Sequence, residues 1–258
     1  MSDKFTAINI KEINNHMFID DDQHILVDTG SQVSFHLSGH INIGDEQITV
    51  PKSIPLVSQD FLSEKVGCEV NGLLGMDIMG KHTILFDLKS NNLFFNDDAI
   101  YIRSLKKSEA AEKMKALMDS MDDIMGGLGG LIDGLDALTG MGNITCVEIE
   151  VNGKTAQMVV DSGARISFIN DSFLMGLKPQ YYLDDFHHSV GDFKTPVYKC
   201  ETNIFVDEPY SEDYGILPEP LMSTLRMFQI DGIIGLNLFR RYRLQFKNGH
   251  VLFPPQGI

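Results

Sequence analysis

The stretch "ILVDTGSQVSF", residues 25–35, places an aspartate directly after an apolar run and follows it with Thr-Gly. The stretch "MVVDSGARISF", residues 158–168, repeats this order in the second half of the chain. In both windows three apolar residues precede the aspartate, a hydroxyl residue and a glycine follow it, and Ser-Phe closes the window. Two copies in register indicate a duplicated structural unit that carries two carboxylates at equivalent positions.

The repeat extends beyond the aspartate windows. "NGLLGMDIM" (71–79) parallels "DGIIGLNLF" (231–239) position by position. Each half therefore has the order strand, Asp-hydroxyl-Gly turn, variable stretch, Gly-apolar-apolar-Gly, helix and hairpin. We expect an N-terminal lobe over residues 1–102 and a C-terminal lobe over residues 143–258.

The segment between the two lobes differs in kind. Within residues 103–142, apolar residues recur at the 3.6-residue spacing of an amphipathic helix, and glycines then weaken the helical tendency by about 1 kcal/mol each. This pattern predicts a helical, Gly-rich linker.

The two lobes themselves are predicted to be mainly β, because short runs rich in Ile, Val and Phe alternate with turn residues. Turns at Gly44-Asp45, Asn152-Gly153 and Asn248-Gly249 predict hairpins. Three short stretches predict helices: "SQDFLSEKVG" (58–67), "SFLMGL" (172–177) and "PLMSTLRMF" (220–228).

Composition excludes several functional classes. The 258-residue chain has a formal net charge of −15, which argues against nucleic acid or an anionic membrane as partner, because both select Lys/Arg patches. No run reaches the roughly 18 apolar residues of a membrane span, and the N-terminus has no apolar core of signal-peptide length. The widely spaced Cys68, Cys146 and Cys200 form neither a disulfide framework nor a zinc pattern, so we expect reduced thiols and a cytoplasmic protein.

The duplicated loops predict that Asp28 and Asp161 meet at a pseudo-twofold axis. Gly30 and Gly163 would let each backbone turn sharply and approach the opposite loop. Carboxylates within about 3 Å of each other cannot both ionise, so they share a proton. One carboxyl can then act as base on a water while the other polarises a carbonyl, which is the chemistry of peptide hydrolysis without a covalent intermediate.

The paired Asp-(Thr/Ser)-Gly loops, together with Leu73-Leu74-Gly75 and Ile233-Ile234-Gly235, resemble those of the aspartic proteases. The resemblance implies a mainly β, two-lobed aspartic protease fold in which Asp28 and Asp161 form the catalytic dyad. Lobes of roughly 100 residues are more similar to retroviral-type protomers than to pepsin lobes. The chain thus resembles two retropepsin-like halves joined in a single polypeptide.

Six residues are expected to support the two catalytic loops: Thr29, Gly30, Ser31, Ser162, Gly163 and Ala164. We expect the Thr29 and Ser162 hydroxyls to bond across the axis. We expect the Ser31 hydroxyl to donate to the nearby carboxylate, a bond that Ala164 cannot make, so that the pH optimum is mildly acidic.

Family members close a hairpin flap over their substrate. The stretch "SVGDFKTPVYKC" (189–200) is the better flap candidate, with Gly191 near the tip and Phe193 as a substrate-covering lid. The hairpin of the first half is shorter, and neither hairpin has the tip tyrosine of pepsin-like members. A one-sided flap would weaken substrate binding.

The sequence thus predicts a monomeric aspartic endopeptidase that cuts peptides bound between its lobes and needs no cofactor or metal. His187-His188 raises the alternative of a metal site, but no third ligand lies at helical spacing nearby. A second alternative is a peptide-binding protein that keeps the fold without catalysis. A third is a regulated scaffold whose partner grips residues 108–125.

Overall fold

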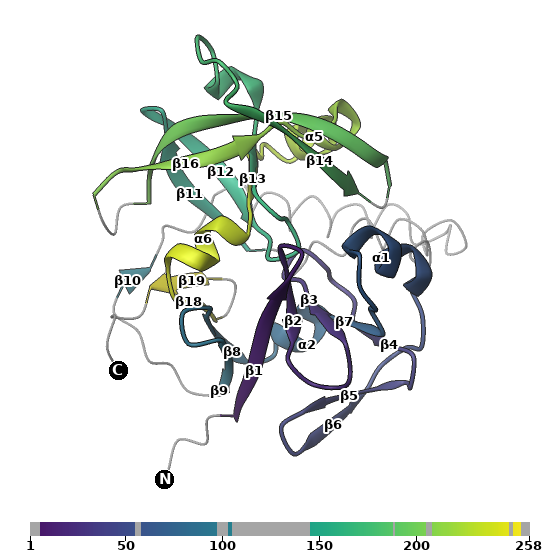
Figure 1. Cartoon of the computed structure of the whole chain (residues 1–258). Coiled ribbons are helices and arrows are strands. Elements are labelled where there is room, and N and C mark those ends of the chain that lie inside the picture. Colours follow the sequence, from purple (N-terminus) through teal and green to yellow (C-terminus); the bar gives the residue numbers. More distant parts are fainter. Residues whose placement is uncertain are drawn as a thin grey trace, which may run out of the picture.

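The computed structural model describes residues 6–54, 58–96, 103–104, 145–187, 189–204, 208–247 and 250–253. This part of the chain is mainly β, which confirms the predicted fold class at that level. In Figure 1 the second half of the chain lies above the first, and strands of both halves meet at the left.

The first half consists of strands and two short helices. Its elements are β1 (Thr6–Ile13), β2 (His16–Ile19), β3 (Ile25–Val27), β4 (Phe35–His36), β5 (His40–Ile43), β6 (Glu46–Thr49), α1 (Gln59–Val66), β7 (Gly72–Leu74), α2 (Met76–Met79), β8 (Thr83–Asp87), β9 (Asn92–Asn96) and β10 (Arg103–Ser104).

The second half repeats much of this order. Its elements are β11 (Cys146–Val151), β12 (Lys154–Val160), β13 (Ser167–Ile169), the 3₁₀ turn η2 (Asp171–Phe173), β14 (Tyr181–His187), β15 (Gly191–Asn203), β16 (Tyr210–Gly215), α5 (Glu219–Met227), β17 (Gly232–Ile234), α6 (Leu236–Arg241), β18 (Leu244–Lys247) and β19 (His250–Phe253).

The strands around the two aspartates pair in the same way in both halves. β3 runs parallel to β7, and β4 pairs with the other edge of β7 in the antiparallel sense. β12 likewise runs parallel to β17, whose other edge pairs with β13. Because a parallel pair needs a long crossover, the variable stretch of each half serves as that connection. The repeat predicted from sequence is therefore a repeat of topology.

One sheet joins the two halves. Its strand order is β10-β19-β18-β8-β9-β1-β2-β3-β7-β4, so the β18–β19 hairpin of the second half lies between strands of the first (Figure 1). The rings of Phe86, Phe239 and Phe246 meet on one face of this sheet. The Phe86 ring makes edge contacts with the other two, with 5.1 Å between ring centroids to Phe239 and 5.3 Å to Phe246. The largest cluster of buried apolar residues accordingly contains members from both halves.

Residues 103 and 104 were expected to begin the linker, but they form β10 and pair with β19. The predicted helix in the remainder of 103–142 lies outside the described residues.

The local predictions from sequence are mostly confirmed. α1 has Ser58 as N-cap, whose side chain accepts from the Phe61 N–H, and ends at Gly67 with φ 75°. The hairpins at Gly44-Asp45 and Asn152-Gly153 have the expected two-residue turns. β18 and β19 pair as expected, although residues 248–249 lie outside the described part. The helix predicted over 172–177 is wrong, since the region makes only the turn η2.

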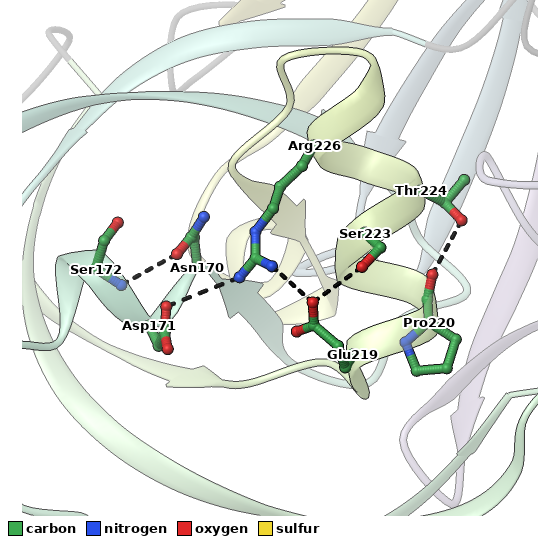
Figure 2. Close-up of polar contacts among 8 residues, drawn as sticks. All are labelled: Asn170, Asp171, Ser172, Glu219, Pro220, Ser223, Thr224 and Arg226. Atoms are coloured by element: carbon green, nitrogen blue, oxygen red, sulfur yellow. Dashed lines mark hydrogen bonds and ion pairs between the residues drawn. The ribbon is translucent and has the colours of Figure 1, made fainter.

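α5 packs against the second half of the chain. Met222 and Leu225 bury one side of the helix in a cluster with Phe168. On the other side, Figure 2 shows Arg226 bridging two acids, Glu219 at 2.8 Å and Asp171 at 3.8 Å. The bridge fastens the helix to the turn η2 beside it.

The two hairpins that were compared as flap candidates from sequence point in different directions. The short β5–β6 hairpin folds onto its own half, since a Cβ at Gly44 would come within 2.5 Å of the Thr6 methyl carbon. Asn42 and Gln23 tie the same hairpin to the β2–β3 turn through two hydrogen bonds. In Figure 1 it lies at the bottom, on the side away from the second half.

The longer β14–β15 hairpin corrects one expectation. Residues 189–200 were expected to form a hairpin by themselves, but from Gly191 onward they belong to a single strand, β15, that pairs with β14. Gly191 lies at the turn, as predicted, with φ 78°.

No helix in the described ranges is both long and apolar enough to cross a membrane.

Phe86→Ala should lower the free energy of unfolding by about 3–5 kcal/mol, because it opens a cavity where the two halves meet. Phe94→Ala, at a half-buried position on the neighbouring strand β9, should cost less than half as much. Urea unfolding followed by circular dichroism measures both values. A cost below about 1 kcal/mol for Phe86→Ala would show that this cluster does not hold the halves together.

Candidate functional site

Two buried strands deliver the paired aspartates. Asp28 follows β3, and its backbone N–H donates to the Leu74 carbonyl at 3.0 Å. Asp161 follows β12, and its N–H donates to the Ile234 carbonyl at 2.9 Å. β7 and β17 thus lie beside the two loops, and these hydrogen bonds fix the backbone position of each aspartate.

Four hydrogen bonds cross between the two loops. The Thr29 N–H donates to Ser162 Oγ at 2.9 Å, and the Ser162 N–H donates to Thr29 Oγ1 at 2.8 Å. The Thr29 hydroxyl donates to the Val160 carbonyl, and the Ser162 hydroxyl donates to the Val27 carbonyl, both at 3.1 Å. Both side chains are buried, so each hydroxyl satisfies a backbone group that water cannot reach. This confirms the predicted bonding across the axis.

Gly30 and Gly163 let each loop face the carboxyl group of the other. A Cβ at Gly30 would lie 2.5 Å from Cγ of Asp161. A Cβ at Gly163 would lie 2.6 Å from Oδ1 of Asp28. Any larger residue would collide with the opposite aspartate, so the glycines are required by close approach.

Backbone N–H groups hold both carboxyl groups in place. Oδ1 of Asp28 accepts from the N–H groups of Gly30 and Ser31, at 2.8 and 3.1 Å. Oδ1 of Asp161 accepts from the Gly163 N–H at 2.7 Å. Both aspartates remain half-buried, which leaves part of each residue open to solvent.

Burial raises the pKa of the Asp161 carboxyl well above its usual value. The charge of Asp28 and a hydrogen bond between the two carboxyl groups raise it further, while the N–H groups of Gly163 and Ala164 act in the opposite direction. The protonated form of Asp161 is therefore favoured next to Asp28. A protonated carboxyl beside an ionised one can donate a proton while its neighbour accepts one.

The expected role of the Ser31 hydroxyl is wrong. Its oxygen donates to the Val33 carbonyl at 3.0 Å and accepts from the Val33 N–H at 3.4 Å. The turn after the aspartate offers these local backbone partners, so the backbone N–H of Ser31 reaches Asp28 and its hydroxyl does not. The difference between Ser31 and Ala164 therefore gives no reason to expect a mildly acidic pH optimum.

Sequence reasoning missed the roles of two serines. Ser34 Oγ accepts from the Gly75 N–H at 2.8 Å, and Ser167 Oγ accepts from the Gly235 N–H at 3.1 Å. Each buried hydroxyl fastens the glycine that follows the parallel strand behind the loop. The signal was visible as the Ser-Phe that closes both aspartate windows.

The residues predicted for the flap lie on the β14–β15 hairpin. Phe193 packs toward its own half, with its ring 6.3 Å from that of Phe168, in a cluster that also includes Ala164. One side chain of the hairpin that does reach the first half is Phe186, whose ring lies 6.2 Å from the His16 ring. Sequence analysis did not single out Phe186.

His16 is buried beneath this contact. Its burial, reinforced by the nearby Arg165 charge, lowers the pKa of the imidazole to about 4. Glu12 opposes the shift. The ring is therefore neutral in the folded protein at neutral pH.

The metal alternative gains no support within the described residues. They contain no group of three or more His, Cys, Asp or Glu side chains suited to a metal ion. His187 Nδ1 lies 2.8 Å from Ser189 Oγ, and His188 lies outside the described part.

No protein-family model matches this chain, and no curated protein sequence matches it. The geometry of the two loops is therefore the basis for assigning a function.

Thr29→Val should lower the free energy of unfolding by about 2–4 kcal/mol, since it leaves the Ser162 N–H and the Val160 carbonyl buried without partners. Thr155→Val, at an exposed position of β12, is the matched control and should stay within about 0.5 kcal/mol of wild type. Urea unfolding measures both. Equal effects of the two substitutions would contradict a structural role for the Thr29 hydroxyl.

His16→Phe should remove part of the acid sensitivity of folding. The folded-state pKa of about 4 lies below the ordinary 6.5, so His16 favours folding fully above pH 6.5 and loses that contribution as the pH falls toward 4. Between these pH values wild type should lose about 3 kcal/mol of stability that the variant keeps. Urea unfolding at pH 7 and pH 4 tests this, and parallel losses in both proteins would contradict it.

Proposed function

We propose that this protein is an aspartic-type endopeptidase whose single chain folds as two retropepsin-like lobes. The observation that carries the proposal is the pair of carboxyl groups, Asp28 and Asp161, each of which lies against the glycine of the opposite loop, on loops joined by four hydrogen bonds. The raised pKa of Asp161 supports a singly protonated pair as the working form.

The mechanism needs only this pair and one water. The ionised carboxylate removes a proton from the water, which attacks the peptide carbonyl carbon. The protonated carboxyl donates its proton to the carbonyl oxygen, giving a tetrahedral intermediate with two hydroxyl groups. The first carboxyl then gives its proton to the leaving nitrogen as the C–N bond breaks, while the second carboxylate takes a proton from one hydroxyl of the intermediate, which becomes the product carboxylic acid. No metal or cofactor takes part.

The rigidity of the loops suits this role. Backbone N–H groups and the crossing hydroxyl bonds hold the carboxyl groups before any substrate binds, so little reorganisation is needed during the reaction. An extended peptide between the lobes would pair its backbone with the β14–β15 hairpin, as a strand added to a sheet edge. The protein acts as a monomer in this proposal, because one chain supplies both aspartates.

A cytoplasmic location belongs to the same proposal. Cys68, Cys146 and Cys200 are free thiols, which suits a reducing compartment.

A second candidate is a peptide-binding protein of the same fold with little or no catalysis. It is favoured by the β5–β6 hairpin, which packs on its own half and leaves the β14–β15 hairpin to reach the other half. It predicts that the wild-type protein retains peptides without generating new termini.

The dyad is tested with Asp28→Asn and Asp161→Asn, assayed by mass spectrometry of termini released from a denatured protein mixture. Each substitution should reduce cleavage by at least about 100-fold, because each removes one of the two proton-transfer groups. Asp45→Asn, at an exposed hairpin turn, is the matched control and should cleave as wild type does. Circular dichroism verifies that the variants fold.

Appreciable turnover by either folded dyad variant would contradict the mechanism. Peptide retention by wild type without cleavage between pH 3 and 8 would favour the second candidate.

A further inference from the structure

A hollow opens where α6 of the second half meets β1 and the β8–β9 turn of the first half. Its volume is about 140 Å³, roughly ten times what a single water needs by the same measure, so it has room for a small organic molecule. None of the residues that line it belongs to either aspartate loop. The hollow is therefore separate from the candidate active site.

Three of the lining side chains are apolar and belong to the packed core. Ile10 and Met17 are buried, and Leu88 packs against the same core cluster. A hydrocarbon group placed against them leaves water, and each methylene removed from water strengthens binding about 4-fold. This part of the hollow suits a short aliphatic group.

The charged side chains of the lining reverse the charge balance of the chain. The sequence has 36 acidic and 21 basic residues. The lining has one acid, Glu12, and three bases, Lys11, Lys89 and Arg240. Arg240 neutralises Glu12 by donating to its carboxylate from both Nε and Nη2, and Lys11 lies 2.8 Å from Asp20. The charge that remains at the hollow is positive, so the hollow favours an anion.

Two donors are available to that anion. Glu12 and Asn15 hold Arg240 through Nε and Nη2, which leaves Nη1 without a hydrogen bond among the described residues. Lys89 has no ion pair within the described part of the chain. Arg240 belongs to the second half and Lys89 to the first, so an anion bound by both would contact both halves.

The turn that carries Lys89 is fixed by its backbone. Asn91 has φ 56°, and its carbonyl accepts from the Ile10 N–H of β1 at 2.9 Å. The Asn91 N–H donates to the Leu88 carbonyl at 3.3 Å. Because these bonds hold the turn against β1, a ligand has little backbone to order when it binds.

We propose that this hollow binds a carboxylate joined to a short aliphatic group. Lys89 and Arg240 hold the carboxylate, and the aliphatic group lies against the apolar side chains of the lining. A free organic acid and the C-terminus of a peptide with an aliphatic last residue share this chemistry. The bound ligand links the two halves and stabilises the folded chain. The site does not depend on the proposed endopeptidase function.

NMR of isotope-labelled methionine methyl groups tests the site directly. Titration with isocaproate at constant ionic strength should shift the Met17 signal and saturate with a Kd on the order of 1 mM, as expected for so small a ligand. Met17→Leu assigns the signal. Isocaproamide lacks the charge and should leave the signal in place. Acetate lacks most of the aliphatic group and should bind at least about 10-fold more weakly.

Thermal unfolding supplies a second measurement that needs no signal assignment. A tenfold excess of isocaproate over its Kd should raise Tm by about 3 °C, because the ligand binds only the folded chain. The same concentration of isocaproamide should leave Tm unchanged. An unchanged Met17 signal together with an unchanged Tm in isocaproate would overturn the site.

Substitution of one lysine tests where the carboxylate binds. Lys89→Gln should weaken isocaproate binding at least about 5-fold, since it removes an ammonium from the anion. Lys81→Gln, at an exposed position outside the lining, is the matched control and should bind as wild type does. Arg240 is kept because it also holds Glu12. Equal affinities of Lys89→Gln and wild type would overturn the assigned position of the carboxylate.

A dipeptide distinguishes the two sources of the ligand. N-acetylglycylleucine carries the same carboxylate and a similar aliphatic group on a peptide, and its C-terminal amide is the control that should not bind. Tighter binding of the dipeptide acid than of isocaproate assigns the site to a peptide C-terminus. Weaker binding assigns it to a free organic acid. Equal binding of the dipeptide acid and its amide would overturn recognition of the carboxylate.

Discussion

Two buried hydroxyl groups, one from each half of the chain, form hydrogen bonds with backbone groups that water cannot reach. The Thr29 and Ser162 side chains each satisfy one N–H and one carbonyl across the axis, and the adjoining glycines leave room for the opposite carboxyl group. Burial of polar backbone is tolerated only because these bonds are complete. The orientation of each aspartate loop therefore depends on the presence of the other.

This mutual dependence has an electrostatic cost that the rest of the fold offsets. Bringing Asp28 beside the half-buried Asp161 disfavours the doubly ionised state, and the raised pKa of Asp161 reflects that cost. The shared sheet and the Phe86 cluster hold the halves together against it. The fold thus supplies the stability that allows two acids to remain in contact. The perturbed pKa that results is of the kind that acid–base chemistry uses.

The aspartate loops could be predicted because their determinants are local and occur twice: an apolar strand, an aspartate, a small hydroxyl residue and a glycine. Contacts that depend on tertiary packing could not. "YYLDDFH" (181–187) has no clean alternation of apolar and polar residues, so nothing marked it as the partner strand of β15. The sequence suggested the carboxylate as partner of the Ser31 hydroxyl, whereas the hydroxyl donates to the Val33 carbonyl within the turn. Phe186 resembles any half-buried aromatic residue until the opposite half is placed beside it.

The pairing of β8 with β18 affects the fraction of molecules in which both aspartate loops are together. An isolated first half would expose the edge of β8, a template on which another copy could add a strand. Two separate chains would form the aspartate pair only while they are associated, and dilution would separate them. Within one polypeptide the connecting segment replaces that second-order encounter by a fixed effective concentration. The completeness of the site is thereby independent of how much protein is present.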